Sequence, residues 1–272
     1  MDHNNITIWA LVASMALLIP AYAISWKMKI PVLRTMTIGL ARMWIQLALL
    51  GIYLKFIFQL NNWVVNISYL LLMTVVAAFS VLSGSPVKMR YWLLPIMASL
   101  TLTLFPIAFF FSEWVVSPLQ LFDARYLIPI SGMLLGNSLK TNIIGLNMFF
   151  GSVRSQQELQ WQMHGLGATK YEALLPIMRQ TIHAAVNPTI ATTATIGLVS
   201  LPGMMTGQLL AGEAPDVAIK YQIAIIIGIL CISFYSVSLQ TFFAYKFGFN
   251  PNHTLKEHTL KPETSGKKSR KM

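Results

Sequence analysis

Long apolar stretches follow one another along almost the whole chain, separated by short polar segments. Each stretch has about the 20 residues that an α-helix needs to cross a bilayer. Inside lipid the backbone polar groups must be satisfied within the segment, which forces helix. We therefore predict an all-α polytopic membrane protein with about seven transmembrane helices. The predicted spans are residues 6–26, 37–60, 63–83, 91–111, 126–150, 181–205 and 217–245.

The low charge content agrees with this prediction. Only 11% of the 272 residues are charged, against about 25% in soluble domains. We assign residues 1–249 to a transmembrane domain and residues 250–272 to a basic cytoplasmic tail, predicted to be disordered and to lie near anionic lipid headgroups. The net charge of +11 resides in short loops and in the tail, so it indicates membrane topology and argues against nucleic-acid binding.

The positive charges also predict the orientation. With the amino end outside, the cytoplasmic segments hold fifteen lysines and arginines, and the outer segments hold only Arg125 and Lys220. Cytoplasmic loops are the ones enriched in Lys and Arg. An odd number of spans then leaves the carboxyl end in the cytoplasm.

None of the nine acidic residues falls in a predicted span. Transporters driven by protons or sodium usually keep an ionisable carboxylate near the midplane, so any pumping by this chain would need another energy source. No Ser-His-Asp or paired-carboxylate site can be assembled at membrane depth, and Cys231 is alone. We therefore predict that the chain is not an enzyme.

Polar residues inside the spans are candidates for a translocation path. Arg42 and Gln46 are four residues apart and share one helix face. Lys140 lies near the middle of the fifth span, where a lysine costs about 2.5–3.5 kcal/mol on insertion scales. Such groups either contact a neighbouring helix or line a path for an anionic or polar substrate.

One glycine cluster opens the fifth span and a second closes the sixth. Their GxxxG pairs predict close helix packing, through Gly132 with Gly136 and Gly203 with Gly207. Each cluster also carries methionine, a soft metal ligand, and a side-chain amide. The further candidates for the path are Met133, Asn137, Met204, Met205 and Gln208, with the three methionines as candidate metal contacts.

Three runs resemble the permease family of bacterial FetB, which includes plant aluminium-sensitivity permeases. They are residues 126–137 (YLIPISGMLLGN), 197–212 (GLVSLPGMMTGQLLAG) and 42–47 (RMWIQL). The likeness extends to about Phe249. It implies the permease subunit of an ABC transporter in the bacterial inner membrane, a homodimer served by a separately encoded cytoplasmic ATPase, with ATP bound by that partner and no cofactor bound by this chain.

The same resemblance bears on substrate and docking. The bacterial member is described as an iron exporter that relieves oxidative stress, and plant relatives are linked to nucleotide-sugar transport. The segment 164–176 is similar to a shortened ATPase-docking loop of ABC importers, with Leu166, Gly167 and Ala168 at its centre. It lacks the acidic-alanine start of that loop.

Two other classes remain open. An ATPase-independent secondary transporter or channel would move substrate without any partner. A seven-span receptor would bind a ligand without net transport.

Overall fold

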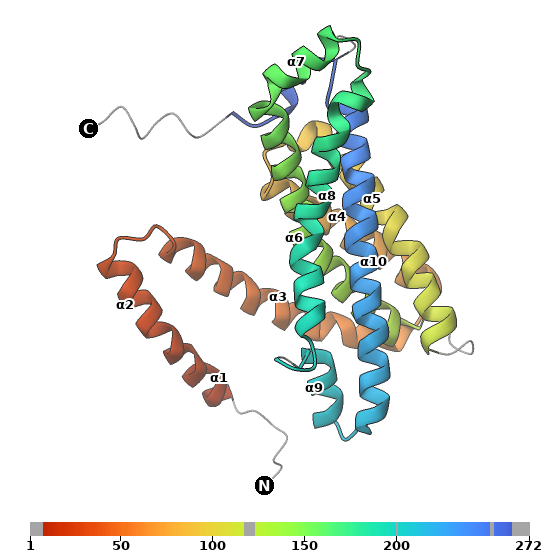
Figure 1. Ribbon diagram of the computed structural model, residues 1–272. Coiled ribbons are helices and arrows are strands. Elements are labelled where there is room, and N and C mark those ends of the chain that lie inside the picture. Colours follow the sequence, from red (N-terminus) through yellow and green to blue (C-terminus); the bar gives the residue numbers. More distant parts are fainter. Residues whose placement is uncertain (1–7, 117–122, 200, 251–252, 263–272) are drawn as a thin grey trace. The chain divides into compact units, whose positions relative to one another are not determined.

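The computed structural model describes residues 8–116, 123–199, 201–250 and 253–262 (Figure 1). The chain divides into two compact units, one ending at Leu60 and the other beginning at Asn61. Helices dominate both units, so the predicted all-α polytopic fold is confirmed.

The amino-terminal unit consists of two long helical segments. The first comprises α1 (Ile8–Ser14), a 3-10 turn η1 (Met15–Leu18) and α2 (Ile19–Lys27), and the second is α3 (Leu33–Leu60). The 3-10 turn precedes Pro20, whose missing N–H leaves a gap in the α-helical bonding. A hydrogen bond of 2.9 Å joins the Tyr22 and Thr37 hydroxyls across the two segments. Of the predicted span 6–26, residues 6 and 7 lie outside the described residues.

The second unit is a bundle of long helices that lie side by side (Figure 1). They are α4 (Trp63–Ser83), α5 (Met89–Phe110), α6 (Ala124–Ser155), α8 (Lys170–Thr195) and α10 (Pro215–Phe247). The helix α6 contacts α4, α8 and α10. A π-helical segment, η2 (Phe111–Val116), extends α5. The third predicted span matches α4. The fourth lies within α5 and η2 together, the fifth within α6 and the seventh within α10.

Side-chain caps fix where three of these helices begin. The Asn62 side chain accepts a hydrogen bond of 2.9 Å from the backbone N–H of Val64, and Asp123 caps α6 in the same way. At α8, Thr169 and Glu172 form a reciprocal capping box. Such caps satisfy amides that have no partner within the helix.

The predicted sixth span, residues 181–205, is wrong in its bounds. Its helix, α8, begins at Lys170 and ends at Thr195. The chain then leaves the helix, with Gly197 at φ +90°, and resumes in the short α9 (Gly203–Leu210). The capping box starts α8 before the predicted first residue of the span, and the α8 helix continues through Pro188. Pro202, in an extended conformation, stands at the N-cap of α9.

Among the described residues, five helical segments are long and apolar enough to cross a membrane: residues 9–27, 33–60, 63–83, 89–115 and 215–247. The helices α6 and α8 have 32 and 26 residues, enough to cross about 30 Å of hydrocarbon. They are more polar than the five. Glu113, predicted to lie outside the spans, falls in the last turns of the fourth segment.

A polar seam runs through the buried faces of α6 and α10. The Asn142 amide donates to the Ser236 hydroxyl at 2.8 Å, and the Gln240 amide donates to the Asn142 carbonyl at 2.9 Å. All three side chains are almost completely buried. Interhelical hydrogen bonds of this kind hold polar helices together in lipid.

The tail departs from its predicted disorder over residues 253–262. Lys261 N–H donates to the Pro86 carbonyl at 2.7 Å, and Lys88 N–H donates to the Thr259 carbonyl at 2.8 Å. Thr259 and Leu260 are buried. Long-range backbone pairing orders this segment against the α4–α5 loop, whereas residues 263–272 lie outside the described residues.

Candidate functional site

A polar strip lies on the exposed face of α6. Asn137, Lys140 and Asn147 are exposed and recur at helical spacing. The Asn137 amide donates to the Met133 carbonyl at 2.9 Å, and Lys140 lies near the middle of the helix. A lysine at that depth is costly against lipid, so this face is suited to a water-filled path or to a partner chain.

A matching strip lies on α8, beside α6. Pro188, Thr192 and Thr195 share one face of α8 and are exposed. The two helices meet where the Thr141 and Thr189 hydroxyls lie 3.4 Å apart. We call the exposed residues Asn137, Lys140, Asn147, Thr192 and Thr195 the α6–α8 polar face. The threonines of α8 and Asn147 were not singled out in the sequence, although their hydroxyl and amide groups inside a predicted span were a usable signal.

The remaining path candidates lie on other elements. Met204, Met205 and Gln208 are half-buried on α9, which packs against α10. The Gln208 carbonyl oxygen is buried and has no hydrogen-bond partner in the described part of the chain. Met133 is half-buried on α6. Arg42 and Gln46 are exposed on α3, in the other unit.

The methionines therefore come from separate elements, α6 and α9. Within the described ranges, no group of three or more His, Cys, Asp or Glu side chains could hold a metal ion. A role of Met133, Met204 and Met205 as metal contacts remains a prediction.

The glycines that allow close helix packing are mostly not the predicted ones. A methyl group built on Gly132 would lie 3.3 Å from the Met73 side chain of α4, but none of Gly136, Gly203 and Gly207 has an atom within 4 Å of that position. Packing of these three inside the chain is not observed. Close packing occurs instead at Gly145 and Gly228. A methyl group built on Gly145 would lie 2.5 Å from the Val237 side chain, and one built on Gly228 would lie 2.7 Å from the Phe111 ring.

The predicted docking residues form a protruding turn between α7 (Gln157–Gly165) and α8. Leu166 is 89% exposed. Gly167 has φ +91°, which side-chain-bearing residues rarely adopt. The Ala168 N–H donates to the Met163 carbonyl at 3.0 Å. The turn, which we call the docking turn, thus presents an uncovered leucine on a fixed backbone.

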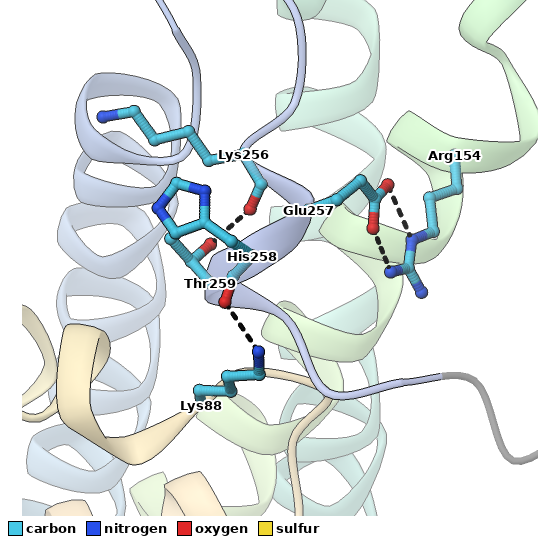
Figure 2. Close-up of polar contacts among 6 residues, drawn as sticks. All are labelled: Lys88, Arg154, Lys256, Glu257, His258 and Thr259. Atoms are coloured by element: carbon cyan, nitrogen blue, oxygen red, sulfur yellow. Dashed lines mark hydrogen bonds and ion pairs between the residues drawn. The ribbon is translucent and has the colours of Figure 1, made fainter.

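Contacts from the tail and from α10 support the docking turn. The His164 ring stacks on His253 at 4.9 Å between centroids. The Lys170 ammonium donates to the Tyr245 carbonyl at 2.6 Å and lies over the Tyr245 ring. The tail is fastened by an Arg154–Glu257 ion pair and by the Lys88 ammonium, which donates to the His258 carbonyl at 2.8 Å (Figure 2).

The two ends of the bundle differ in charge. The α9 end carries Arg125 and Lys220. The Lys220 ammonium lies 3.8 Å from a carboxylate oxygen of Asp216. The α7 end carries more cations: Lys88, Arg90, Arg154, Lys170, Lys246, Lys256 and Lys261. The docking turn therefore lies at the basic end.

Comparisons with known proteins agree with the membrane fold. A family described as "Uncharacterised protein family (UPF0014)" matches residues 8–249. The chain is 30% identical over 261 residues to the "Probable iron export permease protein FetB" of Escherichia coli, covering 96% of this chain and 99% of that one. It is 29% identical to the "UPF0014 membrane protein YjkA" of Bacillus subtilis, covering 95% and 100%.

A plant protein is also similar. "Protein ALUMINUM SENSITIVE 3" of Arabidopsis thaliana is 26% identical, covering 91% of this chain and 89% of that one. No solved structure matches the chain. The family match spans nearly all of the helical region, and the chain therefore belongs to the UPF0014 family of membrane proteins.

Proposed function

We propose that the chain is the permease subunit of an ABC transporter, exporting iron across a bacterial inner membrane with a separate ATPase subunit. The observation that carries the proposal is the docking turn, because Leu166 is 89% exposed beside a short helix at the basic end of the bundle. The basic end is the cytoplasmic one by the rule of positive charges. An ATPase binding there would supply the energy for transport.

The FetB relative is named as a probable iron export permease, and this name supports iron as the substrate. The path would run along the α6–α8 polar face. In a homodimer the two copies of this face would oppose each other and enclose polar groups that lipid would not solvate. Arg42 and Gln46 of α3, in the other unit, remain separate candidates for contact with the substrate.

One observation favours a second substrate class. Lys140 is exposed near the middle of α6 and has no ion pair within the described ranges. An ammonium in this state repels a bare metal cation and attracts an anion. A nucleotide sugar is the anionic candidate. Replacing Lys140 with Met would abolish nucleotide-sugar transport, whereas it would leave ferrous-ion transport unchanged or faster.

The ATPase partner is tested by a charge in the docking turn. Leu166→Asp places a carboxylate in an apolar contact, so the expected result is loss of the co-purifying ATPase. Leu210→Asp is the matched control, because Leu210 is 76% exposed on α9 at the opposite end. Association that survives Leu166→Asp as well as Leu210→Asp would contradict docking at this turn.

Transport itself is tested in proteoliposomes with and without the ATPase. Ferrous ion and a nucleotide sugar are offered in separate experiments. ATP-dependent movement of either supports the proposal and identifies the substrate. Equal flux without the ATPase would mean a secondary transporter or channel, and ligand binding without flux would mean a receptor.

A further inference from the structure

A groove of about 600 Å³ opens between α5 and α10 at the α7 end of the bundle. Its walls are apolar, with Leu94, Pro95 and Ala98 on α5 and Phe243 and Phe247 on α10. Leu94 is 77% exposed and Phe247 is 47% exposed. Both helices are among the segments apolar enough to cross a membrane, so these walls lie against lipid.

The rim of the same groove is cationic. Arg90, in the first turn of α5, lines it together with Lys256 and His258 of the tail. Within the described ranges the Arg90 and Lys256 side chains have neither a hydrogen bond nor an ion pair. The carboxylate within the described tail segment, Glu257, projects to the other side of the tail and bonds Arg154 (Figure 2).

The backbone of the tail segment orients these charged side chains toward the groove. Lys256 and His258 project from one side of the segment and Glu257 from the other (Figure 2). The His258 ring also meets Tyr91 edge to face, with centroids 5.5 Å apart. Residues 253–262 therefore place the Lys256 ammonium and the His258 ring at the groove and point the Glu257 carboxylate away from it.

Few ligands satisfy both parts of this groove. A soluble anion would pair with the rim and leave the apolar walls uncovered. A neutral lipid would cover the walls and leave Arg90 and Lys256 unpaired. A molecule with an anionic head and an acyl chain satisfies both, and the bilayer supplies it where basic side chains meet its surface.

We propose that this groove binds an anionic phospholipid. The phosphate lies on Arg90 and Lys256, with the positive end of the α5 helix dipole adding to the attraction. One acyl chain lies along Leu94, Ala98 and Phe243. Because Lys256 belongs to the tail, the bound lipid also fastens the tail segment to the bundle.

The test measures lipid binding to the purified full chain in neutral detergent by native mass spectrometry. Phosphatidylglycerol and phosphatidylcholine are offered at equal concentration. The expected result is a preference for phosphatidylglycerol that falls on the order of tenfold in Arg90→Gln/Lys256→Gln. The control, Arg125→Gln/Arg179→Gln, removes two exposed cations that do not line the groove and keeps the preference.

A second variant tests the apolar walls. Ala98→Phe fills the groove and is expected to reduce binding of both lipids, with the α-helical circular dichroism unchanged. An equal loss of preference in the two double variants would overturn the proposal, because bulk charge would then explain binding. Displacement of phosphatidylglycerol by inorganic phosphate alone would overturn it too, since the site would then recognise a soluble anion.

Discussion

Adding one methyl group at Gly145 should loosen the junction of α6, α8 and α10. The Cβ of an alanine there would lie 2.5 Å from Val237 Cγ2, 3.5 Å from the Gln240 amide and 3.8 Å from Ala185. Overpacking of this kind costs about 1–3 kcal/mol. Alanine also gains up to about 1 kcal/mol of helix propensity, so Gly145→Ala alone underestimates the clash.

The matched control is Gly136→Ala in the same helix. No atom lies within 4 Å of its Cβ position, so it gains the propensity without the clash. The difference in unfolding free energy between the two variants should therefore be about 1–3 kcal/mol. The assay is unfolding of the purified protein by SDS in mixed micelles, followed by circular dichroism.

The clash is assigned by a second substitution. Val237→Ala removes Cγ2 and makes room for the new methyl group. In the double variant Gly145→Ala/Val237→Ala the coupling energy should be favourable, about 1 kcal/mol or more. Equal stability of the Gly145 and Gly136 variants, or strictly additive effects of Gly145→Ala and Val237→Ala, would refute the reasoning.

Three further predictions concern the α7 end. Lys261→Met removes the ammonium that donates to the Leu82 carbonyl at 2.8 Å and to the Ser85 carbonyl at 2.7 Å. Amide hydrogen exchange at Thr259 and Leu260 should therefore accelerate. The control variant Lys246→Met changes an exposed lysine and should leave this exchange rate unchanged. Gly167→Ala should cost about 1–2 kcal/mol because φ is +91° there, measured by SDS unfolding against Gly165→Ala, which should cost nothing. Glu257→Arg should weaken tail attachment by about 0.2–1 kcal/mol, seen as faster proteolysis of the tail, and Arg154→Glu/Glu257→Arg should restore protection; a swap that gives no rescue would exclude the ion pair as the fastener.

The apolar helices were predictable because hydropathy alone bounds them. The α4 helix matches its predicted residues, since Asn62 caps it and its sequence is mostly apolar and uncharged. The sixth span failed at both ends. Residues 170–180 were assigned to a polar loop although α8 begins at Lys170, and the span was drawn through Gly197 and Pro202, where the chain has already left the helix. The sequence contains the T-x-x-E pattern of a capping box at Thr169 and Glu172. This pattern could have been used to predict where α8 begins.

Other features depend on contacts between distant residues. The order of the tail comes from Lys261 and carbonyls of the α4–α5 loop, and no local pattern encodes such pairing. Gly145 lies in no glycine motif, and its role appears only when Val237 of α10 is beside it. Of the candidate site, Asn137 and Lys140 were singled out by their polarity inside a predicted span, whereas their position beside α8 required the Thr141–Thr189 contact.

The polarity of α6 and α8 has a consequence for how the chain enters the bilayer. Insertion machinery releases a segment into lipid when its side chains partition favourably, and central lysine or asparagine residues oppose this step. Each of these two helices would therefore remain beside the machinery until the other arrives. The connection through α7 would allow them to enter together as an antiparallel hairpin joined by the Thr141–Thr189 contact.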